Sequence, residues 1–118
     1  MPGVQDQLSV VTGVREGCRV VVVSGDLDAD TAFRLDEALD SLPEGLPGLP
    51  VLIDLAGVSV LTSAGVVALL AERLFGRPAL FCPDGSLAGR ILEIVQAQRL
   101  VPIYRDLAAA LAGLGAAA

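Results

Sequence analysis

The sequence has no histidine, no tryptophan and no lysine, and its only cysteines are Cys18 and Cys82. Without histidine the chain lacks the most frequent general base and metal ligand, and the two cysteines form no CxxC pair, so we expect no metal site. The sequence also lacks a Walker loop, a Gly-x-Ser-x-Gly elbow and a Gly-x-Gly-x-x-Gly motif. It therefore predicts neither an enzyme nor a cofactor-binding protein.

Basic residues are few, because eight arginines stand against 14 acidic residues and give a formal net charge of −6 at pH 7. Nucleic acids and anionic membrane surfaces attract clustered basic residues, so we expect neither as a partner. No apolar run approaches the roughly 20 residues that cross a bilayer, and the N-terminal residues do not resemble a signal peptide. We expect a cytoplasmic protein without membrane insertion, in which both cysteines are reduced core residues.

Hydrophobic residues make up 53% of the 118 residues, whereas aromatic residues make up only 3%. This length suits one domain, residues 1–118, and the core must be built from Val, Leu, Ile and Ala. Such a composition is typical of a buried sheet covered by helices.

Hydrophobic periodicity and turn residues predict the order β-β-α-β-α-β-α-β-α. The predicted strands are 8–14, 18–24, 51–55, 79–82 and 101–103, and the predicted helices are 29–42, 64–75, 86–98 and 106–114. Val67, Ala68, Ala71 and Leu74 share one face of the second helix, Ser86 and Asp106 are predicted N-caps, and residues 114–118 are expected to fray. The first two strands form a hairpin and the later ones follow helices, so we expect an α/β fold with a mixed sheet of four to five strands and about four helices.

Two polar corners follow the second and third predicted strands, at residues 25–28 (Gly-Asp-Leu-Asp) and 60–65 (Val-Leu-Thr-Ser-Ala-Gly). Carboxyl ends of parallel strands gather at one edge of a sheet, so these corners are predicted neighbours. Asp26 and Asp28 are either turn and cap residues or an acidic lip beside the second corner. Asp54, in an apolar strand, is expected to make a structural hydrogen bond.

Thr62 and Ser63 stand where the second helix is expected to begin. Hydroxyl groups there cap free backbone N–H groups, and the positive end of the helix dipole tolerates a phosphate. On the residues alone, an ordinary helix cap is the simpler interpretation of Ser63. Gly65, within the first turn, suggests close approach of a partner or of a neighbouring strand.

The stretch from Val51 to Leu70 resembles the signature of the STAS domain family, the anti-sigma factor antagonists of bacteria, in which a strand, an Asp-Ser-Ser/Thr-Gly turn and a helix follow in order. Matched residue by residue, the signature aspartate is Thr62, the phosphorylatable serine Ser63, the second hydroxyl residue Ala64 and the glycine Gly65. Residues 25–28 are similar to the Gly-Glu-Leu-Asp loop of the family. The resemblance extends over most of the chain and implies a STAS-like domain.

The resemblance implies an anti-sigma factor antagonist that binds a serine-kinase type anti-sigma factor, releases a sigma factor and is switched by phosphorylation of Ser63, with Thr62 as the alternative acceptor. It assigns partner binding to Asp26, Asp28, Thr62, Ser63, Ala64 and Gly65. Threonine in place of the aspartate leaves open whether Ser63 is phosphorylated. The turn also resembles the Asp-Thr-Ala-Gly turn of a lipid transporter subunit, so a scaffold or accessory subunit of a stressosome or lipid transporter, without a phospho-switch, is the alternative. Self-association is open.

Overall fold

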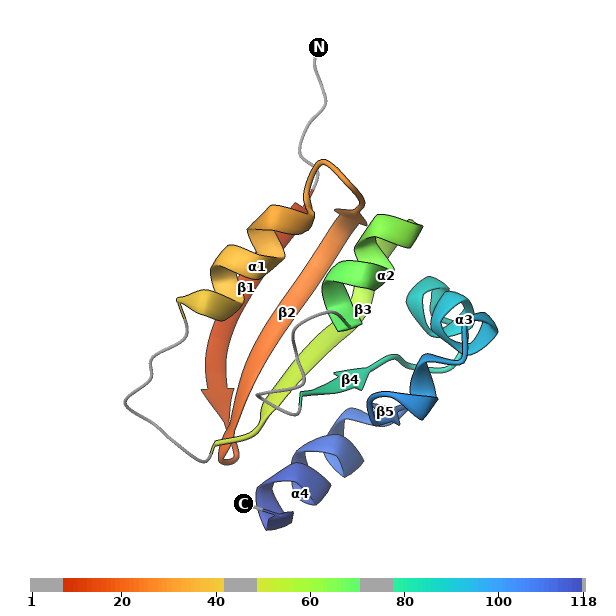
Figure 1. Ribbon diagram of the computed structural model, residues 1–118. Helices are drawn as coiled ribbons and strands as arrows, with labels where there is room; N and C mark the ends of the chain where they lie inside the picture. The colour runs from red at the N-terminus through yellow and green to blue at the C-terminus, as the bar shows by residue number, and fades with distance from the viewer. Residues whose placement is uncertain (1–7, 42–48, 71–77, 118) are drawn as a thin grey trace.

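The computed structural model describes residues 8–41, 49–70 and 78–117, which form one mixed sheet flanked by helices (Figure 1). The strands, in spatial order, are β1 (Leu8–Arg15), β2 (Cys18–Leu27), β3 (Val51–Leu61), β4 (Ala79–Phe81) and β5 (Ile103–Tyr104). The helices are α1 (Ala32–Asp40), α2 (Ser63–Leu70), α3 (Leu87–Ile94) and α4 (Leu107–Ala117), with a 3₁₀ helix over Ala97–Arg99. This confirms the predicted α/β fold class and element order.

A tight turn joins β1 to β2 and makes them the antiparallel pair of the sheet; β2–β3, β3–β4 and β4–β5 are parallel. Glu16 and Gly17 form the turn with φ values of 49° and 81°. Two consecutive positive φ angles are the geometry whose twist matches that of a hairpin. The predicted hairpin is confirmed.

β3 is longer than predicted, because it runs to Leu61 instead of residue 55. It contains two β-bulges. The register with β2 shifts between Val22 and Ser24 and again between Gly25 and Asp26, and each shift places an extra β3 residue opposite β2. At the first bulge the Asp54 carboxylate accepts a hydrogen bond of 2.9 Å from the Ala56 N–H. The expected structural role of Asp54 is therefore confirmed.

Several other boundaries differ from prediction; for example, β2 ends at Leu27 instead of residue 24, and α1 begins at Ala32 instead of residue 29. The helix predicted over 86–98 is interrupted at Gln96, whose left-handed φ of 60° separates α3 from the 3₁₀ helix. The tail expected to fray continues α4 to Ala117. The ends predicted for the first two helices, at residues 42 and 75, and most of the loop between 43 and 50 lie outside the described residues.

The sheet has a core on each face, because successive strand residues point to opposite sides. One core, beneath α1, α2 and α3, includes Leu35, Leu69 and Leu92 from the three helices, together with Val21, Val23 and Ile53 from the strands. The other core is smaller and packs α4, through Ala110 and Leu111, against Cys18, Val20 and Leu52. Cys82 belongs to the first core, so the two cysteines lie on opposite faces of the sheet. Within the described ranges, no helix combines the length and the apolar composition that crossing a bilayer requires.

Candidate functional site

The two polar corners meet at the rim where β2 and β3 end and where α1 and α2 begin (Figure 1). Leu27 and Leu61 are partners in the sheet register, so β2 continues through most of residues 25–28 instead of ending before them. The Thr62 N–H donates a hydrogen bond of 3.2 Å to the carbonyl oxygen of Leu27. The corners are therefore neighbours, as predicted.

The first turn of α2 is capped by Thr62, whereas the sequence alone favoured Ser63 for this role. The Thr62 hydroxyl accepts a hydrogen bond of 3.4 Å from the Gly65 N–H, and the Thr62 carbonyl accepts one of 2.9 Å from the Val66 N–H. Ser63 is the first helical residue, and its side chain is exposed. The serine at the rim is therefore open to solvent and makes no part of this cap.

Gly65 is buried because the first turn of α2 rests on the end of β2. A Cβ atom at this position would collide with the carbonyl oxygen of Leu27 and would lie 2.9 Å from a methyl carbon of Leu61. Of the two explanations that the sequence offers for this glycine, the structure supports close approach of the neighbouring strand. Because Gly65 is buried and Ala64 is half-buried, the exposed residues of this turn are Thr62 and Ser63.

The carboxylate of Asp28 accepts hydrogen bonds in the turn that leads into α1. It accepts hydrogen bonds from the N–H groups of Asp30 at 2.9 Å and Thr31 at 3.1 Å. The buried Thr31 hydroxyl donates to the Asp26 carbonyl at 2.7 Å and accepts from the Asp28 N–H at 3.0 Å. Asp28 therefore acts as a turn residue just before α1, whose N-cap residue is Thr31.

The two acidic side chains of the rim do not form a lip around Ser63. Leu27 is buried in the core beneath the three helices, so the preceding residue, Asp26, directs its half-buried side chain to the opposite face of the sheet. Asp28 is engaged at α1. The structure brings the backbones of the predicted site together, and the hydrogen bonds of the Asp28 carboxylate are made within the turn that precedes α1.

Val67 is a surface residue that the sequence did not single out as exposed. Its exposed fraction is 62%, whereas Gly65 and Leu69 are the buried residues of α2. Val67 lies four residues after Ser63 and hence on the same side of the helix. We define the rim surface as Thr62, Ser63 and Val67, in which an apolar side chain stands beside the exposed hydroxyl.

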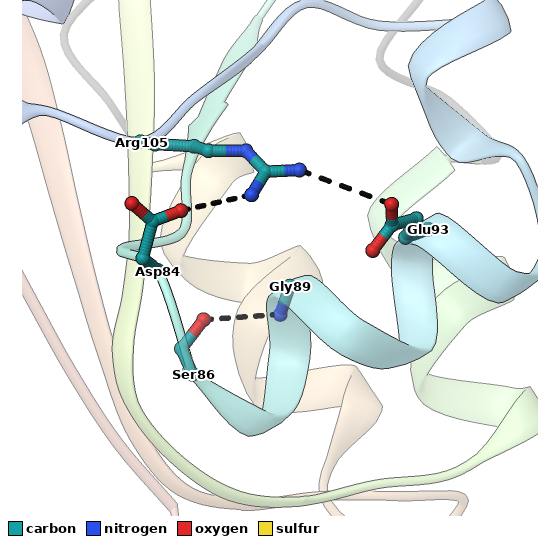
Figure 2. Close-up of polar contacts among 5 residues, drawn as sticks. All are labelled: Asp84, Ser86, Gly89, Glu93 and Arg105. Atoms are coloured by element: carbon teal, nitrogen blue, oxygen red, sulfur yellow. Dashed lines mark hydrogen bonds and ion pairs between the residues drawn. The ribbon is translucent and has the colours of Figure 1, made fainter.

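A second polar site, which the sequence did not predict, is a pocket of about 240 Å³ at the carboxyl ends of β4 and β5. Figure 2 shows Arg105 reaching Asp84 at 2.8 Å and Glu93 of α3 at 4.0 Å. Ser86 caps α3, as predicted, by accepting a hydrogen bond of 3.1 Å from the Gly89 N–H. The hydrogen bond that Arg105 donates to the Asp84 carboxylate raises the pKa of Arg105. These charges pair with one another at the surface, which stabilises the fold little.

Cys82 lines this pocket, but its thiol is not a nucleophile at neutral pH. Burial raises the pKa of Cys82 to about 11; the Asp54 carboxylate adds to the rise and Arg105 opposes it. Burial also raises the pKa of Cys18. The reactive form of cysteine is the thiolate, so both thiols are inert. In the part of the chain that the structure describes, no three metal-ligating side chains cluster together.

Comparison with known proteins identifies one family and several similar solved structures. The model of the STAS domain matches residues 9–110. The crystal structure of an anti-sigma factor antagonist from Mycobacterium paratuberculosis superposes with a TM-score of 0.81 at 24% identity, covering 96% of this chain and 98% of that one. An uncharacterized protein with a SpoIIAA-like fold from Shewanella loihica has a TM-score of 0.59 at 16% identity, covering 97% and 98%. At these identities the structures show a common fold.

We expect Gly65→Ala to lower the free energy of unfolding by about 1 to 3 kcal/mol, because the added methyl group overpacks the contact with Leu27. Urea unfolding followed by circular dichroism measures the change. The control is Gly13→Ala, where an added Cβ meets nothing within 4 Å. Equal stability of the two variants would contradict the contact.

Alkaline pH should unfold the protein partly through Cys82. The folded-state pKa of about 11 lies above the ordinary value of 9.0, so the stability is fully present below pH 9 and is lost as the pH rises through 11. The loss is roughly 3 kcal/mol. Urea unfolding at a series of pH values measures it. In Cys82→Ala, which retains Cys18, the decline should be shallower by most of this amount, and identical slopes would refute the assignment.

Proposed function

The chain belongs to the STAS domain family, and from this premise we propose that it is an anti-sigma factor antagonist, which binds an anti-sigma factor through the rim surface and thereby releases a sigma factor. The observation that carries the proposal is the exposed Ser63 at the start of α2, beside the exposed Val67. A hydroxyl and an apolar side chain together suit a docking surface that a small modification can block.

Phosphorylation of Ser63 is the proposed switch, and two features of the local structure support it. Thr62 makes the capping hydrogen bond, so modification of Ser63 leaves the cap intact. The first turn of α2 contains no acidic residue, and the start of a helix favours an anion. A phosphate adds about −1.5 to −2 charges at neutral pH. Burying that charge against a partner is unfavourable unless the partner neutralises it, so the modified protein stays folded but binds weakly.

The proposed partner is an anti-sigma factor of the serine-kinase type. After incubation with such a factor and Mg-ATP, the intact mass of the protein should increase by one phosphate. Ser63→Ala should abolish the increase, and Thr62→Ala should retain it. Loss of the phosphate only in Thr62→Ala would move the acceptor to Thr62. No phosphate on the wild type, with a factor that binds it, would refute the switch.

We expect Ser63→Asp to weaken binding to the same anti-sigma factor at least about tenfold, which corresponds to about 1.4 kcal/mol, because it places a charge in the docking surface. Isothermal titration calorimetry measures the affinity, and urea unfolding checks that stability is unchanged. The matched control is Gln98→Glu, which adds one negative charge at an exposed residue that lines the pocket at the carboxyl ends of β4 and β5. Undiminished affinity of Ser63→Asp would count against the rim surface as the docking site.

One observation favours a second candidate function, a scaffold or accessory subunit without a phospho-switch. Thr62 stands where the family has an aspartate, and the first turn of α2 contains no acidic residue in its place. If such a carboxylate orients the serine in the kinase, Ser63 is a poor substrate. Genes for an ATPase and a permease beside this one would support the transporter role, whereas a neighbouring anti-sigma kinase would support the first candidate.

A further inference from the structure

Among the residues that the structure describes, the outer side of β1 is a free edge of the sheet. β1 is the first strand in the spatial order, and no described strand lies along its other side (Figure 1). The hairpin turn fixes which backbone groups face outward. Arg15 and Cys18 flank the two-residue turn, so they form a hydrogen-bonded pair, and such pairs alternate along the strands. Residues 9, 11, 13 and 15 therefore bond to β2, and residues 8, 10, 12 and 14 direct their N–H and C=O groups outward.

This edge lacks the features that prevent strands from pairing with another chain. Such features are charged side chains, prolines and very short length. β1 is eight residues long, and residues 8–14 contain neither a charge nor a proline, although the chain carries a net charge of −6. β5, at the opposite edge, has only two residues. β1 is thus an edge with both the length and the chemistry to accept a further strand.

One face of the sheet beside β1 is also open. Val11 is 61% exposed and lies opposite Val22, which is 38% exposed although it belongs to an inner strand. α4 covers this face only further along the strands, over Cys18, Val20 and Leu52. An apolar strip therefore runs from β2 to the edge.

We propose that β1 pairs antiparallel with β1 of a second copy of this chain, so that two five-stranded sheets join into one. A two-fold axis normal to such a pair must pass midway between two directly opposite residues. At any other position, residues with outward backbone groups would face residues whose groups point inward. Val11 is the middle residue of the uncharged run 8–14, so the register that uses the whole run places Val11 opposite Val11 of the second copy. The apolar strip then continues across the axis as Val22, Val11, Val11 and Val22.

The edge chemistry favours a second copy over a foreign peptide. In this register Leu8 faces Val14 and Val10 faces Thr12, so every outward N–H group meets an outward C=O group of the second copy and no charged pair is needed. The contact is a single strand pair, roughly 24 Å long for seven residues. It should bury less surface than the ~800 Å² per partner of a stable complex. The dimer should therefore be weak and reversible. Two copies of net negative charge repel each other, so added salt should strengthen the dimer.

The test uses the wild-type protein from micromolar to millimolar concentration. Sedimentation velocity should show a monomer converting to a dimer, more completely at high salt. Hydrogen exchange measured by NMR should show rising protection of the Val10, Thr12 and Val14 amides with concentration, while the Val11 and Gly13 amides stay unchanged. A monomer throughout, a dimer without this alternation, or a dimer that salt dissociates would overturn the proposal.

Val11→Lys should weaken the dimer at least tenfold, because it places two like charges on the axis. Leu100→Lys is the control, since Leu100 is 66% exposed and lies after α3, away from β1. It should dimerise as the wild type does. Equal dimerisation of both variants would refute the register. Circular dichroism checks their folding, and the exchange experiment on the wild type needs no variant.

Discussion

The carbonyl oxygen of Leu27 is where the end of β2 and the beginning of α2 are held together, and the rest of the rim depends on this contact. It accepts the Thr62 N–H and lies against the backbone of Gly65, where only a glycine fits. Because the first turn is fixed by its backbone and by the Thr62 cap, Ser63 and Val67 are left to face solvent. The fold therefore does not use the side chains of Ser63 and Val67 in the proposed docking surface, whereas the third side chain, Thr62, also caps α2.

Much of this arrangement follows from the sequence, and the parts that do not have definite physical reasons. Apolar periodicity and turn residues predict the element order and the meeting of the two corners. The length of β3 could not be predicted in this way, because Leu55, Val58 and Leu61 face the core three residues apart instead of two. A spacing of two is what identifies a strand, and each bulge hides it. The exposure of Val67 was missed because its valine-rich helix has no polar face to mark the solvent side.

The two polar regions of the molecule are structurally separate. β3 continues from Asp54, its last partner residue for β4, to Leu61 at the rim, which places the pocket at the ends of β4 and β5 on the order of 20 Å away. In that pocket Arg105 joins the segment before α4 to Asp84 and Glu93 (Figure 2). The charges of Arg105, Asp84 and Glu93 pair with one another, whereas the hydroxyl of Ser63 is exposed.

The placement of the cysteines on opposite faces of the sheet has a practical consequence. Their side chains point away from each other across the backbone layer, so they cannot meet in an intramolecular disulfide. Both are also buried and protonated at neutral pH. Because both thiols are buried, we expect the native protein to react only slowly with maleimide reagents. A single cysteine introduced on the rim can carry a fluorophore without removal of Cys18 and Cys82. Partner docking can then be followed by fluorescence in an otherwise unaltered chain.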